Sequence, residues 1–198
     1  MKDVYSYDFY KVSADYIKER IDFTPEIGII LGSCLGPIGD EIKNKTVIKY
    51  KDIPNFLQTT VKSHKGEYIF GELAGKKVIC MSGRFHYYEG YEMNQLQIPI
   101  RVMKLLGVKT VILTNAAGGI NESFKAGDIM LIKDHINLTG LSPVRGPNIS
   151  EFGPRFFDMS EPYDREYMDL ARKAAKDLDI DLKEGVYYYA TGPQFETA

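Results

Sequence analysis

Three short apolar runs in this chain each pass directly into residues suited to hold an anion, and this arrangement most constrains how the chain can fold. The runs are IGIIL at 27–31, KVIC at 77–80 and TVIL at 110–113. Short apolar runs bounded by turn residues are typical of buried strands. Because ligands collect outside the carboxyl ends of strands in open α/β folds, the residues after these runs are expected to line one crevice.

Each run leads into a different kind of donor. The first is followed by GSCLG, in which Ser33 offers a hydroxyl, and the third by TNAAGG, whose small residues let backbone N–H groups approach a ligand closely. After the second run, Arg84, His86 and Tyr88 are spaced at two, so an extended chain would place their side chains on one side. Together these residues predict a crevice for a phosphate-bearing substrate.

A glycine-rich turn after a strand is by itself more often a plain turn than a phosphate cradle. The segment GSCLGPIG lacks the GK[ST] ending of a nucleotide P-loop and the spacing of a dinucleotide fingerprint. The sequence therefore argues against ATP, GTP or NAD as the ligand. The three runs together, in this order, are a more specific indication of a phosphate site than any one of them alone.

Helical and strand-like patterns alternate along the chain. Apolar spacing predicts helices over about 10–21, 96–106 and 163–178, and a strand over 185–190. This order is typical of an α/β sheet with parallel neighbours. No internal repeat, low-complexity segment or linker marks a second domain, so we predict one domain over residues 1–198.

Composition excludes several functional classes. The net charge is −2 and no basic stripe stands out, so a nucleic acid is not expected as a partner. The chain has no long apolar run and no signal-peptide pattern, which predicts a soluble protein without a membrane partner. Cys34 and Cys80 are too few for a disulfide framework, which fits a reducing cytoplasm. No cluster of His, Cys and Asp suggests a metal site.

The stretch Thr139–Phe157 is rich in Gly and Pro and is longer than ordinary connections. Long loops of this kind are usually functional or disordered. Phe152, Phe156 and Phe157 form an aromatic cluster in it, which favours an ordered destination. From the residues alone, burial in the same subunit and contact with another subunit are equally open.

Six motifs in order resemble the trimeric purine nucleoside phosphorylases: LGSCLG (31–36), SHKGE (63–67), SGRFHYYEGY (82–91), TNAAGGIN (114–121), GDIMLIKDHINLTG (127–140) and GPQFET (192–197). The resemblance implies an α/β fold with a central mixed sheet flanked by helices. It also implies a homotrimer that acts in purine salvage, with inorganic phosphate as co-substrate and no cofactor. The expected reaction is phosphate-dependent cleavage of 6-oxopurine nucleosides such as inosine and guanosine, which gives the purine and α-(deoxy)ribose 1-phosphate.

The resemblance also assigns roles to residues. It implies phosphate ligands at Ser33, His64, Arg84, Phe85, His86 and Ala116, with Arg84, His86 and Glu89 as the catalytic groups. It implies nucleoside contacts from Tyr88, Asn115, Ala117, Phe156, Phe195 and Glu196. Of these, Tyr88 matches a residue that binds the ribose, and Phe156 matches a ring that covers the ribose in a neighbouring subunit. Phe195 and Glu196 match residues of the purine site. From the residues alone, a surface ion pair at Arg84 and a solvated carboxylate at Glu196 stay open.

Three functions remain open at this point. The related methylthioadenosine phosphorylases carry a threonine where this chain has Ser33 and a cysteine in the segment that matches TNAAGG, so the resemblance favours the 6-oxopurine enzymes. Because members of the family continue beyond the position of Ala198, the resemblance implies that C-terminal elements are missing. A catalytically impaired fragment that binds phosphate or nucleoside is therefore the third possibility. Cys34 also departs from the family, which usually has glycine there.

Overall fold

The computed structural model describes residues 5–61 and 65–194, and contacts between residues divide the chain into two compact units. The first unit consists of residues 1–116 and 142–153, and the second of residues 117–141 and 154–198. Each unit has its own sheet. The single domain over residues 1–198 stays a prediction.

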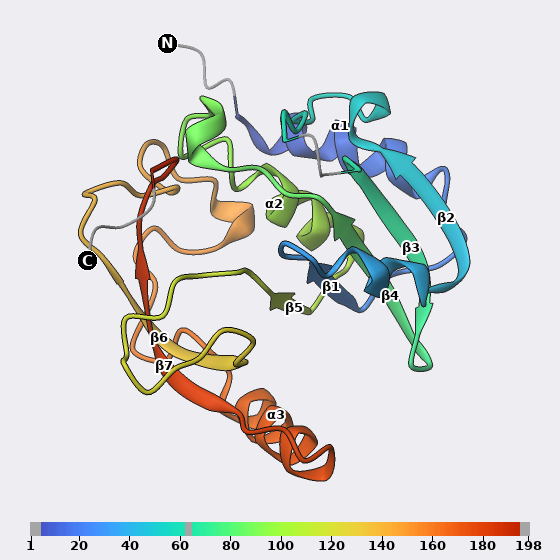
Figure 1. The fold of residues 1–198 in the computed structure, drawn as a ribbon. Helices are drawn as coiled ribbons and strands as arrows, with labels where there is room; N and C mark the ends of the chain where they lie inside the picture. The colour runs from blue at the N-terminus through green and yellow to red at the C-terminus, as the bar shows by residue number, and fades with distance from the viewer. Residues whose placement is uncertain (1–4, 62–64, 195–198) are drawn as a thin grey trace. The chain divides into compact units, whose positions relative to one another are not determined.

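The first unit contains a five-stranded mixed sheet in the order β2-β3-β4-β1-β5 (Figure 1). Its strands are β1 (Ile27–Ile30), β2 (Lys43–Lys49), β3 (Glu67–Leu73), β4 (Lys76–Ser82) and β5 (Thr110–Leu113). Its helices are α1 (Tyr7–Lys18) and α2 (Ile98–Leu106), and its 3-10 turns are η1 (Gly36–Asp40), η2 (Tyr50–Asp52), η3 (Tyr87–Glu89) and η4 (Ser150–Phe152). The central mixed sheet with flanking helices confirms the predicted fold class.

The three predicted strands are neighbours and end at the same edge of the sheet. Strand β1 pairs in parallel with β4 on one side and with β5 on the other. In this register Ile30 lies opposite both Met81 and Leu113. Ile30 and Leu113 are the last residues of β1 and β5, and Met81 is one residue before the end of β4. The segments after all three strands therefore begin close together, as expected for the carboxyl edge of a parallel sheet.

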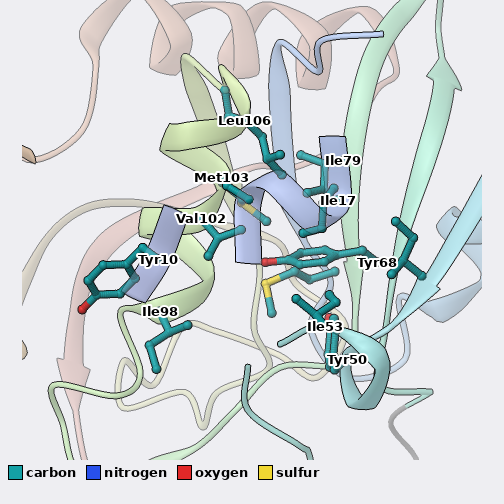
Figure 2. Close-up of a cluster of buried hydrophobic side chains, with 14 of the residues drawn as sticks. Tyr10, Ile17, Tyr50, Ile53, Tyr68, Ile79, Ile98, Val102, Met103 and Leu106 are labelled. Carbon is teal, nitrogen blue, oxygen red and sulfur yellow. The ribbon is translucent and has the colours of Figure 1, made fainter. Parts of the chain in front are cut away.

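The main core lies between the sheet and helices α1 and α2 (Figure 2). Alternate residues of β3 and β4 face this side, and all of these side chains are almost fully buried: Tyr68, Phe70, Ile79 and Met81. Helix α1 contributes Tyr10 and Ile17, and α2 contributes Val102 and Met103. On the other face of the sheet a smaller buried cluster includes Ile69 of β3 and Val78 and Cys80 of β4. Strands β3 and β4 thus have buried side chains on both faces, whereas Ile112 and Leu113 of β5 are exposed.

Local signals set the ends of the two helices. The Ser6 side chain accepts a hydrogen bond from the Phe9 N–H at the start of α1, and Gly107 ends α2 in the left-handed conformation. Helix α1 ends at Lys18, so the prediction that it extends to position 21 was wrong. Beyond the end of the helix, the Arg20 guanidinium donates to the Tyr16 carbonyl and stacks on the Tyr16 ring. Ile21 still packs against the core from outside the helix.

The second unit contains the parallel pair β6 (Met130–Asn137) and β7 (Lys183–Tyr189), with α3 (Arg165–Asp177) between them in sequence. The Asp164 side chain caps α3 by accepting from the Tyr167 N–H. Arg172 of α3 makes a bidentate pair with Glu184 of β7, with N–O distances of 2.7 and 2.9 Å. The third predicted helix and the strand that follows it are confirmed. No helix among the described residues is long and apolar enough to span a membrane.

The aromatic residues of the predicted long loop have different surroundings. Phe152 belongs to the first unit, where its ring packs on Tyr7 and Tyr10. Phe156 belongs to the second unit and is 91% exposed, and Phe157 is half exposed. Burial of all three rings in one subunit is therefore not observed.

Candidate active site

Thr114, which follows β5, joins the ends of the three parallel strands. Its hydroxyl donates to the Ile30 carbonyl at the end of β1 and accepts from the Gly32 N–H, both at 2.8 Å. The Thr114 carbonyl accepts a hydrogen bond from the Arg84 guanidinium at 3.3 Å. One residue thus connects the β1 turn, the β4 segment and the β5 end, which supports the predicted crevice.

The turn after β1 approaches the β5 segment so closely that only glycine fits at position 32. A Cβ on Gly32 would lie 2.8 Å from the Asn115 Cα and from the Thr114 carbonyl oxygen, which backbone atoms cannot accommodate. Ser33 follows this contact and is exposed, so its hydroxyl is accessible at the sheet edge. Cys34 has a φ of +68°, a left-handed conformation that glycine adopts more readily. This agrees with the glycine that the resemblance implies there.

Arg84 is held in a turn that begins at Gly83, whose φ is +99°. Arg84 is partly buried and its guanidinium donates to the Thr114 carbonyl, so the side chain points along the sheet edge toward β5. The Phe85 ring packs into the core against Tyr50, Phe56 and Tyr91. Only the backbone of Phe85 can therefore contribute to an anion site.

Glu89 orients His86 through two hydrogen bonds to one carboxylate oxygen. Its Oε1 atom lies 2.8 Å from the His86 main-chain nitrogen and 2.8 Å from Nδ1. The Glu89 side chain is only 1% exposed. Because an ionised carboxylate only accepts hydrogen bonds, Nδ1 carries the hydrogen of this contact, and in the neutral ring Nε2 is then the acceptor nitrogen.

The second oxygen of Glu89 binds a separate segment of the chain. Oε2 accepts from the Thr60 N–H at 2.6 Å, from the Thr60 hydroxyl at 2.8 Å and from the Thr59 hydroxyl at 3.3 Å. Burial alone would raise the pKa of Glu89, but hydrogen bonds from Thr60 and His86 outweigh it and hold the pKa below its ordinary value. Glu89 therefore stays ionised near neutral pH and connects residues 59–60 to His86.

The His86 and Tyr88 side chains lie together, as the spacing predicted, but Tyr88 is not part of an extended chain. His86 is extended, but the chain enters the 3-10 turn η3 at Tyr87 because Glu89 reaches back to the His86 backbone. The turn stacks the Tyr88 ring on the His86 ring, with centroids 4.7 Å apart. The phenol and imidazole are thus brought together by stacking.

The remaining predicted site residues fall into three groups. Asn115 and Ala116 are exposed after β5, and the Asn115 amide donates to the Ala116 carbonyl at 3.1 Å. Ala117 and Phe156 lie in the second unit, and both are exposed. His64, Phe195 and Glu196 lie outside the described residues.

Sequence reasoning missed Thr114 and Thr60 as parts of the site. A threonine directly after an apolar strand at a carboxyl edge is the signal that could have identified Thr114. No local signal marks Thr60, because its partner Glu89 lies 29 positions away. Within residues 5–61 and 65–194, no three His, Cys, Asp or Glu side chains are grouped to hold a metal ion.

Residues 26–198 match the model of the family described as Phosphorylase superfamily. The chain belongs to this superfamily. It is 52% identical over 185 residues to purine nucleoside phosphorylase 1 of Bacillus subtilis, which covers 93% of this chain and 68% of that protein. It is 44% identical to the purine nucleoside phosphorylase of Mus musculus, with 100% of this chain and 70% of that protein covered.

Solved structures agree with these relatives. The structure of isoform 2 of purine nucleoside phosphorylase from Schistosoma mansoni, in complex with cytosine and ribose-1-phosphate, is 48% identical and has a TM-score of 0.92. The match covers 97% of this chain and 69% of that one. A Schistosoma mansoni purine nucleoside phosphorylase in complex with adenosine is 46% identical, with a TM-score of 0.91 and coverage of 97% and 69%. These relatives confirm the resemblance seen in the sequence.

Proposed function

We propose that the chain is a purine nucleoside phosphorylase that cleaves 6-oxopurine nucleosides such as inosine and guanosine with inorganic phosphate. The observation that carries the proposal is the junction at Thr114, which gathers the Ser33 turn, Arg84 and the Asn115–Ala116 segment at one sheet edge. Relatives at 43–52% identity with the name purine nucleoside phosphorylase support the same reaction. Phosphate is a substrate in this reaction, and no cofactor is required.

The groups at this edge suit the chemistry of phosphorolysis. Arg84 supplies a charged fork for phosphate, and the Ser33 hydroxyl and the Ala116 N–H are further proposed donors. His86 is the other proposed phosphate ligand: its Nε2 accepts from a phosphate hydroxyl in the neutral ring and donates to a phosphate oxygen when the ring is protonated. A phosphate oxygen forms a bond to C1′ of the sugar as the bond from C1′ to the purine nitrogen breaks and its electrons pass to the base. The phosphate charge stabilises the positive charge that develops on the sugar. Attack opposite the leaving base gives the α-sugar 1-phosphate.

Base recognition is proposed for Phe195 and Glu196, with Tyr88, Asn115, Ala117 and Phe156 as nucleoside contacts. A carboxylate at Glu196 would accept a hydrogen bond from the protonated ring nitrogen of hypoxanthine or guanine, which adenine lacks. We also propose that the enzyme is a cytoplasmic homotrimer in purine salvage. Light scattering of the purified chain tests the trimer directly.

The proposal is tested by comparing inosine and methylthioadenosine as substrates in the presence and absence of phosphate. Phosphate-dependent release of hypoxanthine from inosine supports the proposal, whereas preferential cleavage of methylthioadenosine favours a methylthioadenosine-type phosphorylase. Binding alone does not separate the two, because a relative in the Schistosoma structures is complexed with adenosine. Phosphate binding without cleavage of either nucleoside would indicate a binding fragment.

A further inference from the structure

A buried tyrosine from a distant segment holds the turn that carries Arg84. The Tyr50 hydroxyl donates a hydrogen bond to the main-chain carbonyl of Gly83 at 2.7 Å, and Tyr50 is only 1% exposed. Gly83 directly precedes Arg84 and has a φ of +99°. Glycine has more conformations open to it than any other residue, so the hydrogen bond from Tyr50 restrains a part of the backbone that is intrinsically free to vary.

Tyr50 also contacts the residue on the other side of Arg84. Its ring packs on the Phe85 ring with centroids 5.2 Å apart. The Tyr50 N–H donates to the Gly66 carbonyl at 2.9 Å, and the Gly66 N–H donates to the Ser82 carbonyl at 3.0 Å. Tyr50 is thereby tied to the end of β4 through its backbone and to the following turn through its side chain.

We propose that Tyr50 is a positioning residue for the anion site: it fixes the backbone on both sides of Arg84 so that the guanidinium meets the ligand in one orientation. Taking that ligand to be phosphate rests on the function proposed above. The opposite end of the Arg84 side chain is held by the Thr114 carbonyl. Arg84 is therefore fixed at its backbone by Tyr50 and at its guanidinium by Thr114. A bidentate contact with phosphate depends on both, because small misplacements of a charged ligand-binding group cost large factors in binding and rate.

The Tyr50 hydroxyl acts as a constant donor. Burial raises the pKa of Tyr50 well above its ordinary value, so the hydroxyl keeps its proton throughout the neutral range. Tyr68 offers a matched control in the same aromatic cluster (Figure 2). It is fully buried, and its hydroxyl donates to the Pro99 carbonyl of α2 at 3.4 Å, away from the Arg84 turn. Loss of either hydroxyl removes one buried hydrogen bond, but only Tyr50 bonds the turn.

The experiment compares Tyr50→Phe with Tyr68→Phe and the wild-type chain. Calorimetric titration with inorganic phosphate gives the Kd, and steady-state kinetics give the KM for phosphate and for inosine separately. We expect Tyr50→Phe to raise the phosphate Kd and KM about fivefold, the factor that corresponds to one buried hydrogen bond, and to leave the inosine KM within about twofold. We expect Tyr68→Phe to change the phosphate Kd by less than about twofold.

Hydrogen exchange at the Arg84 and His86 amides, measured without ligand, gives a second readout. Exchange is expected to be faster in Tyr50→Phe than in Tyr68→Phe. Equal phosphate Kd values in the two variants, or equal exchange at these amides, would overturn the role of Tyr50. Phosphate binding by the wild-type chain without cleavage of inosine would contradict the proposed function alone, because the Kd comparison still decides the role of Tyr50. No phosphate binding by the wild-type chain would contradict both.

Discussion

Replacement of Thr114 by valine tests the junction at the carboxyl edge, because valine keeps the shape of threonine and removes its hydroxyl. The hydroxyl makes two hydrogen bonds of 2.8 Å, one to the Ile30 carbonyl and one from the Gly32 N–H. Gly32 is buried, so its N–H would be left without this acceptor and without ready access to water. At about 1 kcal/mol for each bond, we expect Thr114→Val to lower the free energy of unfolding by about 2 kcal/mol.

The assay is urea unfolding followed by circular dichroism, with hydrogen exchange at the Ile29 and Cys80 amides to report on the first unit. A loss of about 2 kcal/mol corresponds to a decrease in Tm of about 4–8 °C for a chain of this size. Thr114→Ser is the matched control, since it keeps the hydroxyl and loses only a methyl group. We expect Thr114→Ser to retain most of the stability. The hydroxyl does not join the strand ends if the free energy of unfolding of Thr114→Val lies within about 0.5 kcal/mol of the wild-type value. The same conclusion follows if Thr114→Ser is as unstable as Thr114→Val.

Three further predictions concern single side chains. Glu89→Gln should destabilise the chain at pH 7 by about 1–3 kcal/mol, because it removes a charged acceptor of hydrogen bonds from Thr60 and His86. Cys34→Gly should raise the free energy of unfolding by about 0.5–1 kcal/mol, because the φ of +68° strains a side chain but not glycine. In native protein at pH 8 a thiol reagent should modify exposed Cys34 but not Cys80, since burial raises the pKa of the Cys80 thiol to about 12.

The pH dependence of the Glu89 variant supplies its own check. The pKa of Glu89 is lower in the folded state than its ordinary value of about 4.3. The ionised carboxylate therefore contributes its full share of the free energy of unfolding above about pH 4.3, and this share is lost as the pH falls through the folded-state pKa. The difference between wild type and Glu89→Gln should therefore shrink in acid. A difference in unfolding free energy that is unchanged between pH 7 and pH 3 would contradict the ionised state of Glu89.

The two cysteine predictions are checked by melting curves and by labelling. Cys34→Ser is the control for Cys34→Gly, because it removes the thiol and keeps a side chain in the strained conformation. A gain in stability in Cys34→Ser would show that loss of the thiol, and not relief of backbone strain, stabilises the chain. If the Ser33–Cys34 turn belongs to the phosphate site, phosphate should slow the labelling of Cys34. Labelling that is indifferent to phosphate would count against that assignment, and rapid labelling of Cys80 would show that the β4 core opens readily.

The sequence predicted the features that depend on local pattern. Apolar runs identified β1, β4 and β5, and parallel pairing brought the segments that follow them to one edge. Contacts between distant segments carry no such pattern. The hydrogen bonds from Thr60 to Glu89 and from Tyr50 to Gly83 join residues 29 and 33 positions apart. The spacing of Arg84, His86 and Tyr88 did not predict the 3-10 turn at Tyr88, because that turn depends on the hydrogen bond from the His86 N–H to the Glu89 side chain.

Resemblance supplied what local pattern could not. The roles of His64, Phe195 and Glu196 rest on their motifs, because these residues lie outside the described part of the chain. The proposed roles of Arg84 and His86 also rest on the motifs, and the structure adds that these side chains are held by Thr114 and Glu89. The surroundings of these two side chains are thus observed, and their contact with phosphate stays a proposal.

Cleavage of inosine by the purified chain, measured as hypoxanthine release with and without inorganic phosphate, decides whether the chain is a phosphorylase. We expect release that depends on phosphate, yields ribose 1-phosphate in equal amount, and falls at least about tenfold in Arg84→Lys, which keeps the charge but loses the guanidinium fork. Release that is equally fast without phosphate, or that is unaffected by Arg84→Lys, would contradict a phosphorylase built on this edge of the sheet.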